Sequence, residues 1–269
     1  MPKRIPGTHF ARNLVERRTL ITQLVKRDFQ QRYVGSAAGW LWGLIHPLVL
    51  LASYVFIFAI CLKMTPPPDA ATQNYPMYLF AGMLPWMLFS ETVLRSAGCL
   101  IDQANLITKT VFPAEIVPVS IFLSSLMGHL LAVSLVIGGA AIYLRHFSPV
   151  LVLLPVFWFL VGLFAIGIGW IAAALQVYLR DTAQVLTVIL TLWFWATPIL
   201  ISEDKFPPWG AVVLQANPLT YLVRAYRAVL LGGAVSLHDL GFTAAFAVTA
   251  FVCGGLIFRY MKRGFADVL

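Results

Sequence analysis

The feature that most constrains the fold of this chain is the stretch from His146 to Ser202, in which only the adjacent Arg180 and Asp181 carry charge. About 20 apolar residues are enough for an α-helix to cross a bilayer. The stretch is too long for one crossing and about right for two. We therefore interpret Arg180 and Asp181 as the polar tip of a helical hairpin that lies at the membrane surface.

The whole chain has the composition of a multi-pass membrane protein. Hydrophobic residues make up 60% and charged residues only 11%, whereas a soluble domain carries about 25% charged residues. Charges, prolines and glycines separate six apolar segments, so we predict an all-α fold with six transmembrane helices. The predicted spans are 37–62, 76–101, 116–144, 150–179, 182–201 and 240–258. They form one transmembrane domain, 37–269, after an N-terminal cytoplasmic segment, 1–36.

The segment 206–232 is apolar but is not counted as a span. Several residues in it break helices, because proline removes a backbone donor: Pro207, Pro208, Gly210, Asn217 and Pro218. We predict two short helices with a break at Asn217–Pro218, entering and leaving the membrane on one side. A surface amphipathic loop is the alternative.

Basic residues predict the orientation, because Lys and Arg are enriched in cytoplasmic loops. Eight precede the first span, two lie in loops on the same side and three in the C-terminal tail, against five on the other side. An even number of spans then places both termini in the cytoplasm.

The N-terminal segment has no continuous apolar core of the kind that a cleavable signal peptide needs. Its apolar residues instead recur at helical spacing between Lys and Arg: Leu14, Val15, Leu20, Ile21, Leu24, Val25 and Phe29. This pattern is typical of an amphipathic helix in the headgroup plane. A solvated cytoplasmic helix is the alternative.

No catalytic or nucleotide-binding motif is visible in the sequence. Gly162 and Gly167 have the spacing of a phosphate-binding loop, but Ile168 follows where that loop needs Lys. Three cysteines and five histidines are scattered along the chain, so we expect no metal and no cofactor in this chain. Its net charge of +8 belongs to a membrane face, and we expect no nucleic-acid partner.

Glu91 and Arg95 are the only ionisable pair well inside a predicted span. At positions i and i+4 they fall on one face of a helix and can pair. Either they line a conduit or subunit seam, or they neutralise one another near the cytoplasmic interface. The second interpretation is the simpler one.

Five stretches of the sequence carry a family resemblance. They are RYVGSAAGWLWGLIHPL (32–48), GMLPWMLFSE (82–91), NLITKTVFPAEIVP (105–118), YLRDTAQVLTVILTLWFWATPIL (178–200) and NPLTYLVRAYRAVLL (217–231). Together they resemble the membrane-spanning permease of ABC-2-type polysaccharide exporters, which move O-antigen, capsular polysaccharide and teichoic acid. The most specific pieces are Lys109-x-x-Phe112-Pro113-x-Glu115 and Arg180-Asp181 followed by Thr197-Pro198-Ile199. Leu200 stands where close members have Tyr.

The resemblance implies a division of labour. Two copies of the permease pair with two copies of a separate cytoplasmic ATPase, which binds Mg-ATP, and move a polyprenyl-linked polysaccharide across the bacterial inner membrane. The segment 102–115 and the hairpin tip are then expected to contact the ATPase. The coupling candidates are Asn105, Lys109, Phe112, Pro113, Glu115, Arg180 and Asp181.

Aromatic, basic and small residues supply further candidates. Aromatic faces that could stack on sugars are Tyr33, Trp42, Trp193, Phe194 and Trp195, although Trp and Tyr also anchor spans at the interface. Arg27 and Arg32 are candidates for the pyrophosphate of a lipid-linked headgroup, with anionic bilayer lipid as the alternative. Gly35, Gly39 and Gly43 are spaced for close helix packing, in a dimer seam or within one subunit.

Two other classes of protein fit parts of the sequence. An ABC-2 permease for a drug or lipid shares the six-span plan. A membrane-embedded enzyme, such as a glycan polymerase or acyltransferase, would need converging acid, base or nucleophilic groups, and the sequence contains no such cluster.

Overall fold

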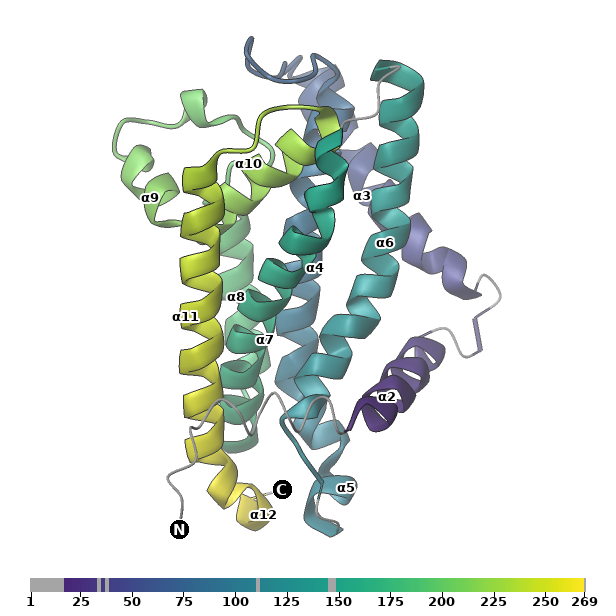
Figure 1. Ribbon diagram of the computed structural model, residues 1–269, viewed down its shortest axis with the longest axis vertical. Coiled ribbons are helices and arrows are strands. Elements are labelled where there is room, and N and C mark those ends of the chain that lie inside the picture. Colours follow the sequence, from purple (N-terminus) through teal and green to yellow (C-terminus); the bar gives the residue numbers. More distant parts are fainter. Residues whose placement is uncertain (1–16, 33–34, 37–38, 110–111, 145–148, 269) are drawn as a thin grey trace.

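The computed structural model describes residues 17–32, 35–36, 39–109, 112–144 and 149–268. Within these ranges the chain forms helices and short connections, with no β-strand. The fold class is therefore all-α, as the sequence predicts. The long helices run side by side, with α9 (Gly210–Ala216) and α10 (Pro218–Leu231) at one end of the bundle and α2 (Arg18–Gln31) near the other (Figure 1).

In the part of the chain that the structure describes, five helices are long and apolar enough to cross a membrane, and they match five of the six predicted spans. The first is α3 (Trp42–Tyr54), which continues as a π-helix (Val55–Cys61). The others are α4 (Tyr75–Asp102), α6 (Ile116–Leu144), α7 (Leu154–Tyr178), which follows a 3₁₀ turn (Pro149–Leu153), and α11 (Leu237–Met261). In the hydrophobic core, α7 lies between α4 and α11, and α4 is the most deeply buried of the five.

The prediction of a helix over 182–201 was wrong at its C-terminal end. Helix α8 (Thr182–Trp195) has 14 residues, or about 21 Å at 1.5 Å per residue, which is shorter than the hydrocarbon core of about 30 Å. Pro198 ends it, because the residue before a proline is pushed out of the helical region. Residues 196–201 form turns.

The predicted stripe of Gly35, Gly39 and Gly43 is also corrected. Gly35 (φ +78°) and Gly39 (φ +52°) lie before α3 in the left-handed region, and a Cβ at either would meet open space. The α-helix begins only at Trp42, so these three glycines do not form one helical face.

Close helix packing occurs instead between α7 and α11. A Cβ on Gly254 would lie 2.1 Å from the carbonyl oxygen of Gly167, and one on Gly167 would lie 2.4 Å from that of Ala250. Small residues allow this approach of two backbones. Neither glycine was singled out for packing from the sequence.

The segment 206–232 breaks where the sequence predicts. Helix α9 (Gly210–Ala216) ends at Asn217, and α10 (Pro218–Leu231) begins after it. The Asn217 side chain accepts hydrogen bonds from the backbone N–H of Leu219 (3.0 Å) and from Nε1 of Trp193 (2.8 Å), and donates one to Oγ1 of Thr197 (2.9 Å). Asn217 thus caps α10 and ties it to the end of α8. Most of α10 is buried, against α4 and α11.

A buried arginine on α10 fixes the turn after α8. Arg227 is 8% exposed and donates to the carbonyls of Tyr78 (3.2 Å), Pro198 (2.9 Å) and Ile199 (2.7 Å). Its guanidinium lies 3.7 Å from the centre of the Tyr78 ring. A Cβ on Gly82 would lie 2.7 Å from Nη2 of Arg227, so Gly82 makes the room that this side chain occupies.

Candidate functional site

The site begins with a cluster of four charged side chains from two helices. Helix α2 (Arg18–Gln31) and the residue after it supply Asp28 and Arg32, and α4 supplies Glu91 and Arg95. Arg95 donates to Asp28 at 2.5 Å, and Arg32 donates to Glu91 at 2.7 Å. Arg32 Nε also lies 3.4 Å from Asp28 Oδ2. Two positive and two negative charges therefore compensate one another.

A hydroxyl from a third helix completes this charge cluster. Ser125 of α6 donates to Glu91 (3.0 Å) and accepts from Arg32 (3.1 Å) and Arg95 (3.3 Å). The charge cluster thus joins α2, α4 and α6.

The mutual pair predicted for Glu91 and Arg95 is a minor contact in this charge cluster. Their closest atoms lie 3.7 Å apart, because each side chain has a nearer partner near the end of α2. Asp28 was missed as a site residue. A signal did exist: Asp28–Arg32 and Glu91–Arg95 are both acid–base pairs spaced i, i+4, which can cross-pair when two helices cross.

The apolar stripe of the N-terminal helix is used for packing within the protein. Ile21 and Leu24 are buried and form a small cluster with Ile116 at the start of α6. Leu20, Val25 and the half-buried Phe112 and Leu123 pack against the same cluster. Leu14 and Val15 lie outside the described residues. The basic residues Lys26 and Arg27 are exposed.

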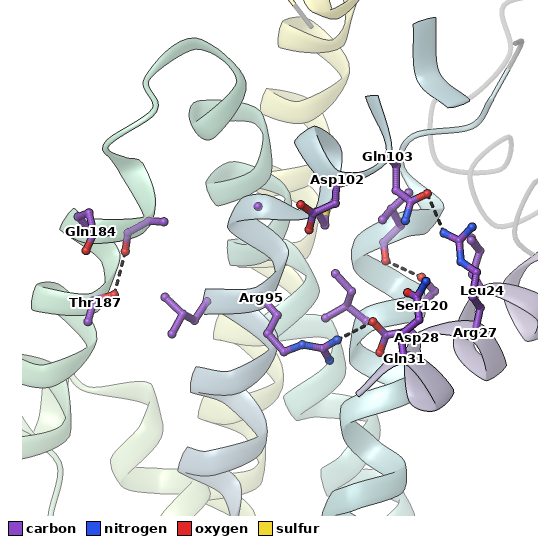
Figure 2. A pocket seen from close by; sticks show the side chains of 16 residues that line it. Leu24, Arg27, Asp28, Gln31, Arg95, Asp102, Gln103, Ser120, Gln184 and Thr187 are labelled. Carbon is purple, nitrogen blue, oxygen red and sulfur yellow. Dashed lines mark hydrogen bonds and ion pairs between the residues drawn. The ribbon is translucent and has the colours of Figure 1, made fainter. Parts of the chain in front are cut away.

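A cavity of about 690 Å³ lies between α2, α4, α6 and α8. Figure 2 shows Arg95 and Asp102 between Gln184 and Thr187 on one side and Asp28, Gln31 and Arg27 on the other. Its polar lining consists of Arg27, Asp28, Gln31, Arg95, Asp102, Gln103, Ser120, Gln184 and Thr187. The charge cluster therefore borders a space that a ligand can fill.

A smaller cavity, about 230 Å³, lies on the other side of the charge cluster, between α3, α4 and α6. Arg32 and Glu91 reach it from the charge cluster, and Trp42, His46 and His129 contribute its other polar or aromatic groups. Trp42, a predicted substrate-path residue, is 52% exposed.

The two headgroup candidates have different surroundings. Arg32 is bound to two carboxylates in the charge cluster. Arg27 donates to the neutral amide oxygen of Gln103 at 2.7 Å, so this contact leaves its charge uncompensated. Tyr33 lies outside the described residues.

The coupling segment forms a short helix at the same end of the bundle. Helix α5 (Ala104–Lys109) exposes Asn105 and Lys109. Phe112 and Pro113 instead point inward: the first is half-buried and the second is buried. The sequence did not distinguish these two groups of residues.

Glu115 binds the C-terminal segment. Its carboxylate accepts a hydrogen bond from Nζ of Lys262 at 2.6 Å, and its carbonyl accepts one from Trp170 at 3.0 Å. Glu115 immediately precedes α6, and its contact with Lys262 joins the start of α6 to the end of α11.

The turn predicted at Arg180 and Asp181 is confirmed as the connection between two helices. Arg180 and Asp181 are exposed in the turn between α7 and α8. Gln176 closes the turn, because its side chain donates to the carbonyl of Arg180 and accepts from the N–H of Ala183, both at 2.7 Å. Tyr178 also donates to the carbonyl of Met261 at 2.8 Å. This turn, the start of α6 and the end of α11 therefore meet at one end of the bundle.

The three consecutive aromatic residues of α8 project in different directions. Trp193 packs on Phe89 and Phe164, and Phe194 packs on Trp86. Trp195 is 53% exposed. Of the three, Trp195 presents the most accessible ring to a substrate.

Metal ligation finds no support in the part of the chain that the structure describes: no three His, Cys, Asp or Glu side chains gather there in a group that could hold an ion. The charge cluster pairs its acids with arginines, so it offers no carboxylates free for a cation.

Five long apolar helices, a helix α2 attached to them by charges and a polar cavity at one end of the bundle are, among the described residues, the features of a multi-pass membrane protein. The chain belongs to the ABC-2 type transporter family, whose model matches residues 19–231.

Curated relatives match almost end to end. The chain is 30% identical over 259 residues to an O-antigen export system permease protein of Myxococcus xanthus, covering 95% of this chain and 97% of the relative. It is 26% identical to a protein of the same name from Klebsiella pneumoniae, covering 93% and 95%. It is 22% identical to a polysialic acid transport protein of Escherichia coli, covering 89% and 92%.

Proposed function

We propose that this chain is the permease subunit of an ATP-driven exporter that moves a lipid-linked polysaccharide from the cytoplasm across the bacterial inner membrane. The observation that carries the proposal is the match, over at least 89% of the chain, to relatives named for O-antigen export and polysialic acid transport. The polar cavity and the charge cluster at one end of the bundle give this role a physical basis.

In this proposal the chain crosses the membrane six times, with both termini in the cytoplasm. Helix α8 and the turns after it make the fifth crossing. Helices α9 and α10 re-enter the membrane from the outer side, where the protein around α10 satisfies the broken backbone. The contacts of Glu115 with Lys262 and of Tyr178 with Met261 support a common, cytoplasmic end for α6, α7 and α11.

A separate ATPase supplies the energy. Two copies of the permease bind two copies of that subunit, which holds Mg-ATP. The exposed Asn105, Lys109, Arg180 and Asp181 form the contact surface, and Phe112, Pro113 and Glu115 transmit its motion into the bundle. Lys262 takes part through its hydrogen bond to Glu115.

The substrate follows α8 outward. Gln184 and Thr187 line the larger cavity, and Thr191 and Trp195 continue the same exposed face of the helix. These residues offer uncharged polar groups and one ring, which let a glycan slide without binding it strongly. Arg27 binds the phosphate of the lipid carrier at the membrane surface, whereas Arg32 is paired with carboxylates in the charge cluster.

Deletion of the gene, with and without plasmid-borne wild type, tests the proposal. Labelled glycan on the outer face should fall at least tenfold in the deletion strain, accumulate inside as the lipid-linked form and return with the wild-type gene. Unchanged surface glycan, together with altered resistance to a drug or altered lipid export, would favour the other branch of the family and reject this proposal.

A further inference from the structure

The charges that line the larger cavity sum to zero. Arg27 and Arg95 are the cations, and Asp28 and Asp102 are the anions. Arg95 and Asp28 bind one another at 2.5 Å. Arg27 and Asp102 come from α2 and α4, and the carboxylate of Asp102 forms no hydrogen bond or ion pair with any residue that the structure describes.

Unused hydrogen-bonding groups face this cavity from three helices. Gln31 of α2, Asp102 of α4 and Gln184 of α8 are exposed side chains in its lining. None of the three side chains has a hydrogen-bond partner among the described residues. Figure 2 shows Asp102 between Gln184 on one side and Gln31 on the other. Together they offer four donors, from two amides, and several acceptor oxygens.

Three kinds of ligand can be compared with this lining. A diphosphate in the middle of the cavity would meet both carboxylates as well as the two guanidinium groups, so the lining as a whole gives it no net attraction there. An apolar chain would bury polar groups without partners, at a cost of about 1–3 kcal/mol for each. A sugar ring is neutral, and its hydroxyls both donate and accept. It therefore matches an arrangement of two amides and one carboxylate.

We infer that the larger cavity binds a sugar ring, namely the ring nearest the diphosphate of a lipid-linked glycan, through Gln31, Asp102 and Gln184. This inference rests on the proposed function. The volume of about 690 Å³ is within the range of small-molecule sites, about 300–1,000 Å³. Arg27, whose partner Gln103 is neutral, stands at the same cavity and meets the diphosphate. The carrier's charge is thus bound beside the sugar and not among the carboxylates.

Binding of synthetic carriers to the full-length protein in lipid nanodiscs tests this assignment. The probes are farnesyl diphosphate and the same molecule bearing one glucose, galactose or N-acetylglucosamine. We expect wild type to bind at least one sugar-bearing probe about tenfold more tightly than farnesyl diphosphate, because hydrogen bonds to a charged acceptor are strong. The variants Asp102→Asn and Gln184→Ala should reduce that preference about tenfold and threefold. Gln184→Ala should leave the affinity for farnesyl diphosphate unchanged, and Asp102→Asn should not weaken it, because this variant removes a negative charge from the lining.

Two further variants show whether the effect on binding is specific to the sugar. Arg27→Gln should weaken every probe by a similar factor, because all of them carry the diphosphate. Asp69→Asn removes an exposed carboxylate before α4, at the opposite end of that helix from Asp102, and should change nothing. The affinity ratio is insensitive to the fraction of folded protein, so a variant with lower yield still gives a valid reading.

The inference is overturned if wild type shows no preference for any of the sugars, or if Asp102→Asn and Gln184→Ala leave the preference intact. The gene deletion distinguishes a failure of the sugar-site inference from a failure of the proposed function. A strain that loses surface glycan on deletion, with a protein that ignores the sugar, rejects the sugar site alone. A strain whose surface glycan is unaffected rejects the proposed function as well.

Discussion

Asp28 in α2 accepts a hydrogen bond at 2.5 Å from Arg95 in α4, 67 positions later in the sequence. This contact attaches α2 to α4, the most buried of the long helices, beside the apolar contacts that Ile21 and Leu24 of α2 make with Ile116 at the start of α6. The position of α2 therefore depends on charge as well as on packing.

Loss of this ion pair should loosen α2. Asp28→Asn leaves Arg95 partly buried without its nearest carboxylate, and we expect a cost of about 1–3 kcal/mol, between that of an exposed and a buried pair. The measurement is thermal unfolding of the detergent-solubilised protein, together with the rate of tryptic cleavage in α2. The exchange Asp28→Arg with Arg95→Asp should restore part of the loss. Equal behaviour of Asp28→Asn and the exposed control Asp204→Asn would contradict the role of this contact.

The seam between α7 and α11 should not accept a single methyl group. Gly254→Ala places a Cβ 2.1 Å from the carbonyl oxygen of Gly167, and overpacking of this kind costs about 1–3 kcal/mol or more. Gly138→Ala is the matched control, because a Cβ there meets open space on α6 and alanine favours a helix. Fluorescence-detected size-exclusion chromatography should show a loss of folded protein for the first variant and none for the second. A folded Gly254→Ala at normal yield would mean that the helices separate easily.

Arg227 should resist replacement by lysine. Lysine keeps the charge but lacks the planar fork that reaches three carbonyls, so we expect Arg227→Lys to lower stability by about 2–4 kcal/mol. Arg259→Lys, at an exposed position near the end of α11, is the control for thermal unfolding.

A double-mutant cycle tests the link between Arg227 and Gly82. Gly82→Ala should destabilise the wild type, because its Cβ would lie 2.7 Å from Nη2 of Arg227, but should cost much less in an Arg227→Ala background. Additive effects would show that Gly82 is needed for some other reason.

Charge reversal at the end of the bundle that we propose to be cytoplasmic should separate ATP hydrolysis from transport. Lys109 and Arg180 are exposed, so Lys109→Glu and Arg180→Glu should leave the protein folded and in the membrane. Surface glycan should nevertheless fall about tenfold, and the substrate should no longer stimulate the ATPase, because a repelled contact cannot transmit force. Lys205→Glu is the control, because Lys205 lies between α8 and α9, at the opposite end of α8 from Arg180. Normal export by both variants would reject a coupling role for these charges.

The sequence was sufficient for features that depend on solvent and local backbone chemistry. The runs without charge predicted five spans to within a few residues, except at the start of α3, and Pro218 with Asn217 predicted the break before α10. The hairpin tip at Arg180 was predicted because a charged pair has to reach the membrane surface. Helix α8 was extended too far, since Ala196 and Thr197 look apolar enough to continue it and only Pro198 signals the end.

The candidate site was harder to predict from the sequence, because it depends on contacts between residues that lie far apart in the chain. Glu91 was matched with Arg95 on its own helix, whereas its nearest basic partner is Arg32, 59 positions earlier. The neighbouring sequence does not show why Gly254 must be a glycine and Gly255 need not be. The reason is the close approach of the α7 backbone to Gly254, which only the fold shows. Asp102 seemed part of a coupling segment until the fold placed it in a cavity.

Trp195 should matter for transport and not for folding. Its ring is 53% exposed on the face of α8 that continues from the cavity, whereas Trp193 and Phe194 hold the core together. Trp195→Ala should therefore reduce the export rate about two- to tenfold, the loss expected from one aromatic contact of about 0.5–1.5 kcal/mol, at unchanged thermal stability. Trp209→Ala removes an even more exposed ring, 74% accessible, that sits outside this face, and should leave export unchanged. Pulse-labelled glycan arriving on the outer face measures the rate. If both variants slow export equally, the two rings act as membrane anchors. That result would contradict the proposal that α8 lines the substrate path.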